Sequence, residues 1–242
     1  MPSNVHVVAS KFDLHIIVAP VFATNTCILV TDDNNAIVVD PGAGVADQVI
    51  KLVTQNGWQV KAIAATHGHA DHTWDGGKLS QHFKVPFLIN EADRYRLDDP
   101  IGTLQPKDAR PDQSVAVAIA HAVRAMGAGE YLKPDDIQTF GPSAPSPLLS
   151  TLGLDLVFAP GHTEGSTLYL TKEFVLSGDV LFAGSIGRTD LPGGDIGTMM
   201  QSLRSLATEL NPDLTMIPGH GPSTTVAQEL ASNPYWKAAI NG

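Results

Sequence analysis

The densest group of potentially reactive side chains lies in residues 66–72, which read Thr-His-Gly-His-Ala-Asp-His. Three imidazoles and one carboxylate occur directly after the apolar stretch 62–65. Neutral imidazole and ionised carboxylate are ligands that Zn²⁺ and Fe²⁺ accept, whereas structural zinc sites usually include cysteines, which this run lacks. The run therefore indicates a metal site with an open position for water. The alternative is a histidine-rich loop that binds metal adventitiously.

Three further candidate ligands stand beside glycine in the second half of the chain. Each follows an apolar run that reads as a strand: His162, Asp179 and His220. Strand ends are where folds of alternating strands and helices collect their ligands. The recurrence of one context at three separate places favours the metal site over the adventitious loop.

The elements that must position these residues read as an alternation of strands and helices. The predicted strands are residues 14–18, 27–30, 36–39, 60–65, 86–89, 154–159, 174–177 and 214–217. The predicted helices are residues 45–55, 73–83 and 115–126, and residues 141–147 are predicted to form a loop. Period-2 and period-3.6 patterns of apolar residues support these assignments and an α/β fold class.

Length and composition are those of one α/β domain. The chain has 242 residues, of which 43% are hydrophobic, enough to bury a sizeable core. We expect a single domain over residues 1–242, with a partly helical insertion around 98–150. This insertion is expected to be a lid over the site, a dimer face or a packing helix.

Charge and cysteine content limit the partners and the location. With 15 basic and 25 acidic residues the formal charge is −10, which disfavours nucleic acid and anionic membranes as partners. Residues 1–5 lack the start of a signal peptide and no segment has the length of a membrane span, so a cytoplasmic location is expected. The single cysteine, Cys27, sits in an apolar run and is predicted to be a buried hydrophobe and not a catalytic thiol.

The ligand pattern resembles that of the metallo-β-lactamase superfamily, His-x-His-x-Asp-His followed by a distant His, an Asp and a last His. All seven positions are filled. The resemblance implies a four-layer αββα sandwich and two divalent metal ions, zinc first, with iron or manganese as alternatives. It implies a first metal held by His67, His69 and His162, a second held by Asp71, His72 and His220, and Asp179 as the bridge between them.

Residues 182–195 are similar to the glyoxalase II group, the hydroxyacylglutathione hydrolases, particularly their short bacterial form. Asp179 separates the chain from true β-lactamases, which carry Cys or Ser at the matching position. Larger glyoxalase II enzymes hold glutathione with a basic C-terminal helical region, whereas here 22 residues follow His220 and Lys237 is their single base. The resemblance therefore leaves the carrier thiol open.

The activity that the resemblance implies is hydrolysis of a small acyl thioester by a hydroxide held between two metals. Asp71 is then a metal ligand that also orients the hydroxide. One alternative is a persulfide dioxygenase with a single iron on His67, His162 and Asp179. A non-catalytic binding protein is the third hypothesis.

Two residues outside the ligand set are singled out by the same resemblance. Arg188 matches a basic residue that meets the anionic thiol carrier in that group. The alternative is that Arg188 pairs with Asp190 or Asp195 and only shapes the loop. Asp40 is expected either to fix the imidazole of a metal ligand or to cap the turn that follows it.

Overall fold

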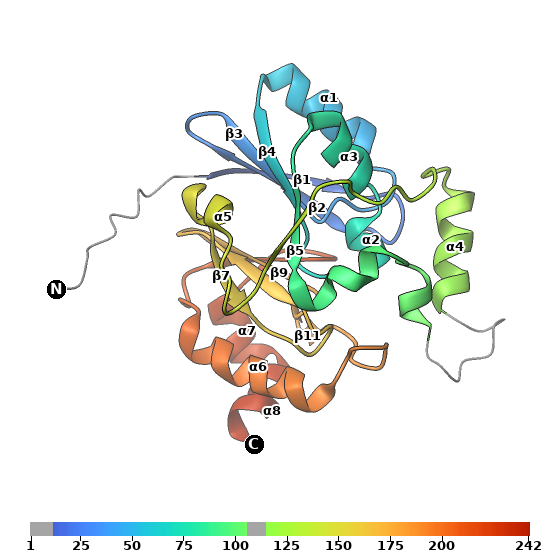
Figure 1. The fold of residues 1–242 in the computed structure, drawn as a ribbon. Coiled ribbons are helices and arrows are strands. Elements are labelled where there is room, and N and C mark those ends of the chain that lie inside the picture. The colour runs from blue at the N-terminus through green and yellow to red at the C-terminus, as the bar shows by residue number, and fades with distance from the viewer. Residues whose placement is uncertain (1–11, 106–114) are drawn as a thin grey trace.

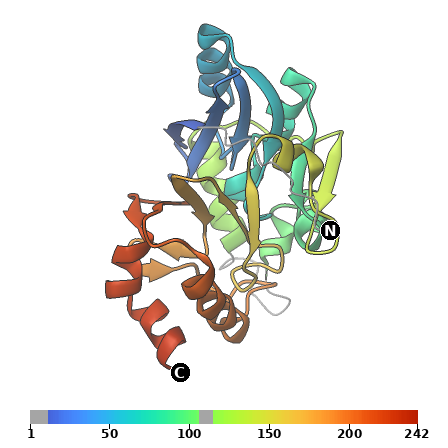
Figure 2. The ribbon, with the colours of Figure 1, turned by 90° about the vertical axis from the view of Figure 1, so that its left-hand side faces the viewer.

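The protein is described by a computed structural model that covers residues 12–105 and 115–242. Two β-sheets pack face to face, and helices cover the outer face of each sheet (Figure 1). The view turned by 90° also shows the helices near the C-terminus at the opposite end of the molecule from α1 (Figure 2). This arrangement is the four-layer αββα sandwich, so the predicted fold class is confirmed.

The first sheet follows chain order. Its strands are β1 Phe12–Val18, β2 Asn25–Thr31, β3 Asn35–Val39, β4 Gln59–Ala64, β5 Phe87–Asn90 and β6 Ile137–Phe140. The pairs β1–β2 and β2–β3 are antiparallel, whereas β3 to β6 run parallel. The parallel strands therefore end at one common edge of the sheet.

The second sheet has the order β13-β12-β9-β8-β7. Its strands are β7 Asp155–Phe158, β8 Thr167–Leu170, β9 Phe174–Gly178, β12 Thr215–Pro218 and β13 Thr224–Thr225. The central pair β9–β12 is parallel, so these two strands also end side by side. A separate hairpin joins β10 Leu181–Phe182 to β11 Ser185–Ile186.

The core lies in three layers. Between the sheets, Leu29 and Ile37 pack with Tyr169 and Leu176 in one buried cluster. Outside the first sheet, the cover is α1 Ala46–Asn56 and α3 Gly76–Phe83. Outside the second sheet, the cover is α6 Ile196–Glu209, α7 Val226–Ser232 and α8 Pro234–Asn241.

The remaining helical elements are α2 Ala70–Thr73, η1 Glu91–Leu97, η2 Gly102–Leu104, α4 Val115–Ala125 and α5 Pro147–Thr151. Within the region expected as an insertion, β6 joins the first sheet and Leu149 of α5 enters the core between the sheets. Helix α4 stands at the side of the sandwich (Figure 1) and packs through Ile119 and Val123 against Trp74. Residues 106–114 of that region lie outside the described part of the chain.

The helix predicted over 73–83 is wrong at its start, because the chain forms two helices, α2 and α3, with a turn at 74–75. Asp75 explains the break: its Oδ2 accepts hydrogen bonds from the backbone N–H groups of Gly44 (3.0 Å) and Ala46 (2.8 Å) at the start of α1. The loop predicted over 141–147 is wrong at its last residue, because Ser146 caps α5 and Pro147 opens it.

Cys27 is buried, as predicted. Burial raises the pKa of its thiol, so the reactive thiolate is disfavoured. No helix within residues 12–105 and 115–242 combines the length and the apolar character needed to cross a membrane.

Candidate metal centre

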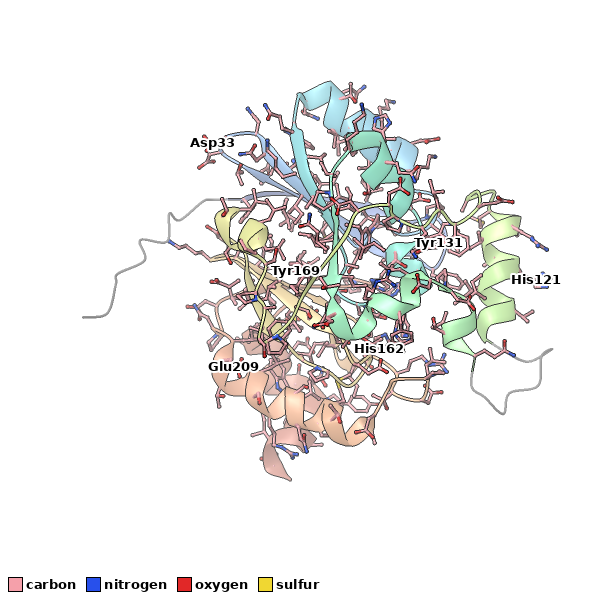
Figure 3. All side chains as sticks on the ribbon, viewed as in Figure 1. Asp33, His121, Tyr131, His162, Tyr169 and Glu209 are labelled. Carbon is pink, nitrogen blue, oxygen red and sulfur yellow. The ribbon has the colours of Figure 1, made fainter. Side chains whose placement is uncertain are left out.

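The predicted ligands come from loops at the ends of strands in both sheets. Residues 67–72 follow β4 of the first sheet, whereas Asp179 and His220 follow β9 and β12 of the second. His162, marked in Figure 3, lies in the loop between β7 and β8. The backbone N–H of Thr167 donates to the carbonyl of Thr66 (2.9 Å), so the sheets are joined directly beside the site. The structure brings all seven residues into one cluster.

The first ligand set contains three buried histidines. Ligand atoms of His67, His69 and His162 all lie within 4.8 Å of one another. The Nε2 atoms of His67 and His162 are 3.2 Å apart. Two nitrogens bound to one tetrahedral zinc at about 2.0–2.1 Å are roughly 3.3 Å apart, so this spacing fits a shared metal ion.

The second ligand set contains Asp71, His72 and His220. Nε2 of His220 lies 3.2 Å from Nε2 of His72 and 3.2 Å from Oδ2 of Asp71. This is again the spacing of groups that share one cation.

Asp179 stands between the two sets. Its Oδ2 lies 3.6 Å from Nε2 of His162 and 3.6 Å from Nε2 of His220, and its Oδ1 lies 3.3 Å from Nε2 of His72. A Cβ on Gly219 would collide with Oδ1 of Asp179 and with the ring of His72. Glycine before His220 therefore leaves room for the carboxylate.

Backbone carbonyls fix the orientation of two ligand rings. Nδ1 of His162 donates to the carbonyl of Arg188 (2.7 Å), and Nδ1 of His220 donates to the carbonyl of Phe22 (2.9 Å). A proton held on Nδ1 leaves the lone pair of Nε2 directed into the centre, which is the tautomer that binds a metal.

Asp40 follows β3, the parallel neighbour of β4, and its side chain is buried. Its two oxygens accept from the backbone N–H (2.7 Å) and the hydroxyl (2.8 Å) of Thr66, and Oδ2 lies 3.0 Å from Nδ1 of His72. The hydroxyl of Thr66 in turn contacts Nδ1 of His67 (3.1 Å). Asp40 thus faces the imidazole of His72 directly and is linked to that of His67 through the hydroxyl of Thr66, while the N–H of Gly42 in the following turn donates instead to Thr26.

The electrostatics prepare most of the ligands for metal binding, but the facing carboxylates raise the pKa of His72 and His220, so a metal must displace a proton from these two rings. Burial and the neighbouring imidazoles hold the pKa of His67 and His69 well below the usual value, so both rings are neutral. Burial alone would raise the pKa of Asp71 and Asp179, but His72 and the other histidines hold both below the ordinary carboxyl value. Neutral imidazoles and charged carboxylates are the forms that a metal requires.

The residues fit a divalent metal. Buried atoms at the centre without a hydrogen-bond partner in the described chain include Oδ1 of Asp179 and Nε2 of His69. Buried polar atoms without a partner are costly unless an ion or a water molecule satisfies them. Lone pairs of nitrogens that face each other at 3.2 Å also need a cation between them.

One functional residue that the sequence analysis missed is Asp93, which is fully buried in η1. Its Oδ2 accepts from the backbone N–H of Gly68 (2.7 Å) and from the hydroxyl of Thr163 (2.7 Å). Its Oδ1 accepts from the backbone N–H of Gly165 (3.0 Å) and from Nε of Arg96 (3.3 Å). Asp93 therefore joins the loop of His67 and His69 to the loop of His162. Its place three residues after parallel strand β5, with no glycine beside it, was too weak a signal to single it out.

Arg96 extends this connection to a third loop. Its guanidinium is completely buried and donates through Nη2 to Glu164 (2.6 Å) and to the carbonyl of Pro192 (2.8 Å). These bonds attach residues 182–195, the segment similar to glyoxalase II, to the loops that carry the metal ligands.

A cavity of about 300 Å³ opens beside the ligands, and Arg188 lines it. The guanidinium makes two parallel bonds of 2.7 Å to Asp190, from Nε to Oδ1 and from Nη2 to Oδ2. Asp195 instead caps α6 by accepting from the backbone N–H of Thr198. Arg188 thus both borders the cavity and is paired, and its role as a substrate-binding residue stays a prediction.

A four-layer sandwich with histidines and aspartates gathered at its strand ends defines a class of metal-dependent hydrolases. The sequence model of the metallo-beta-lactamase superfamily matches residues 21–220, and the chain belongs to this superfamily.

One curated protein and two solved structures are similar to the chain over nearly their whole length. The chain is 31% identical to hydroxyacylglutathione hydrolase GloC of Haemophilus influenzae, over 92% of this chain and 97% of that protein. The structure is similar to TTHA1623 in a di-iron-bound form, with TM-score 0.73, 26% identity and coverage of 91% and 99%. It is also similar to the BLEG-1 B3 metallo-beta-lactamase, with TM-score 0.71, 29% identity and coverage of 96% and 100%.

Proposed function

We propose that the protein hydrolyses a small acyl thioester with two divalent metal ions, zinc first, held by the seven ligands. The observation that carries this proposal is the place of Asp179, whose Oδ2 is 3.6 Å from a nitrogen of each ligand set. A carboxylate between two sets suits two neighbouring cations. The proposed enzyme acts in the cytoplasm on a small molecule and not on nucleic acid or membrane.

Bound metals of this kind supply water of lowered pKa and polarise a carbonyl oxygen. The chain itself contributes Asp71, which lines the cavity and stays negatively charged, and we assign it the orientation of the attacking water. Among the described residues that line the cavity, none is a Lys, Tyr or Glu that could protonate a leaving group. This suits a thiolate, which leaves without a proton.

The relatives support this proposal to different degrees. The Haemophilus influenzae protein is named a hydroxyacylglutathione hydrolase, which is a thioester hydrolase. The similar BLEG-1 structure is named a β-lactamase, and Asp179 argues against that activity here because the resemblance places Cys or Ser at this position in true β-lactamases. Persulfide dioxygenation by one iron remains the alternative, since His67, His162 and Asp179 could form its triad.

The test combines metal analysis with three assays on the same purified protein: thioester cleavage, β-lactam cleavage and persulfide-dependent oxygen uptake. We expect two metal ions per chain and thioester cleavage that is lost after chelation and restored by zinc. One iron per chain with oxygen uptake would replace the proposal by the dioxygenase. Fast β-lactam cleavage without thioester cleavage would also refute it.

A further inference from the structure

The cavity beside the metal centre has a lining of two kinds. Four of the metal ligands line it: His69, Asp71, His162 and Asp179. The apolar part of the lining, here called the apolar wall, consists of Phe22, Leu104, Ile119, Phe182 and Leu191. These residues come from five separate segments, so the wall is a product of the fold and not of one motif.

Three residues of the apolar wall are packed in place. Leu104, Ile119 and Leu191 are 1%, 6% and 8% exposed and belong to one buried cluster that also contains Trp74. Buried side chains in close packing do not rearrange freely, so this part of the wall has a fixed shape, whereas Phe22 is 41% exposed. Ile119 is the contribution of α4 to this wall.

The positive charge of Arg188 at the cavity is paired with a carboxylate. Arg188 is the one Lys or Arg among the described residues that line it. Asp190 neutralises this guanidinium through their paired bonds, and the hydrogen bond from Arg188 holds the pKa of Asp190 at about 2. Arg188 keeps further N–H groups that can donate to a neutral carbonyl.

We propose that the cavity takes a small apolar acyl group on a carrier that is uncharged next to its sulfur, and that Ile119 sets the acyl preference. This inference rests on the proposed thioester hydrolase function. A hydroxyl on the acyl group would lose its hydrogen bonds to water on binding, and the side chains of the apolar wall offer no replacement, so binding such a group costs free energy. Among the described residues that line the cavity, no Lys or Arg is left unpaired to meet the two carboxylates of glutathione, whereas a neutral amide carrier suits the paired Arg188.

The test uses zinc-loaded protein and four thioesters, butyryl and lactoyl each on N-acetylcysteamine and on glutathione. On N-acetylcysteamine we expect kcat/KM for butyryl to exceed that for lactoyl by about tenfold or more, the discrimination that an apolar pocket provides. For either acyl group the glutathione thioester should not be the better substrate. A preference for lactoyl or for glutathione would overturn the inference while leaving the hydrolase intact. Failure to cleave all four would overturn the proposed function and the inference with it.

Variants on α4 make the test residue-specific. Ile119→Ala should lower kcat/KM for butyryl by about tenfold and leave lactoyl nearly unchanged. His121→Ala is the matched control, because His121 is exposed on the same helix and points away from the body of the protein (Figure 3). An equal loss of kcat/KM for both acyl groups, with an unchanged circular dichroism spectrum, would show that Ile119 does not determine the acyl preference.

A second variant tests the paired charge of Arg188. Asp190→Asn removes the counter-charge of Arg188, so KM for the glutathione thioester should fall while KM for the N-acetylcysteamine thioester stays the same. An unchanged KM for the anionic substrate would contradict the role given to the ion pair.

Discussion

Replacing Asp93 by Asn tests whether this buried carboxylate holds the ligand loops together. The carboxylate accepts from Gly68, Thr163, Gly165 and Arg96. An amide keeps one oxygen and turns an NH₂ group toward two of these donors. At about 1.5–3 kcal/mol for each hydrogen bond to a charged group, the free energy of unfolding should fall by about 3–6 kcal/mol.

The same substitution should weaken metal binding, because Asp93 fixes the loops of His67, His69 and His162. Loss of a group that orients metal ligands typically costs about 10–100-fold in affinity, and we expect a loss in this range. The assays are urea denaturation of the metal-free protein and competition for zinc with a chromogenic chelator.

Glu164→Gln is the matched control for Asp93→Asn. Glu164 bonds the same Arg96, but its side chain is 44% exposed, so the expected change in stability is below about 1 kcal/mol. Its zinc affinity should equal that of the wild type. Asp93→Asn protein with wild-type zinc affinity and an unchanged denaturation midpoint would show that Asp93 does not hold the ligand loops together.

Three further predictions concern the bridge, the second ligand set and the thiol. Asp179→Asn should lower turnover by orders of magnitude and disturb the loading of both metals, since an amide cannot balance two cations; near-normal activity with two bound metals would disprove the bridge. His220→Ala should reduce the metal content to one ion and abolish hydrolysis, whereas persistent oxygen uptake with one iron would favour the dioxygenase. Because burial raises the pKa of Cys27, the native thiol should react slowly with a disulfide reagent at mildly alkaline pH and quickly in urea; fast labelling of the native protein would contradict its burial.

The ligands could be found from the sequence because they stand at strand ends, five of the seven directly beside a glycine, a context that is local in the chain. Residues 67–72 show this pattern within a single turn, and His220 shows it within three residues. The parallel strands then bring these local patterns together at common edges of the sheets. Local signals were sufficient wherever the side chain itself supplies the chemistry.

Asp93 could not be found in this way because its importance lies in distant partners. Gly68 is 25 residues away in the chain and Thr163 is 70 residues away. Arg96, which is completely buried, reads in the sequence as an ordinary surface cation. Only the pairing of the two sheets shows that these residues meet.

The C-terminal helices were absent from the sequence prediction although a signal for one of them was available. The spacing of Met199, Leu203, Leu206 and Leu210 is helical. By contrast, a strand of two residues such as β13 carries too few residues for a period to be seen.

The origin of the ligands in both sheets gives the metals a second effect, on the assembly of the fold. His67 and His69 come from the first sheet and His162 from the second, so an ion bound by all three ties the two halves of the sandwich together. A ligand that binds only the folded state stabilises it by about 4.1 kcal/mol when its free concentration is a thousand times its dissociation constant. Metal supply would then change the stability of the folded protein as well as its activity.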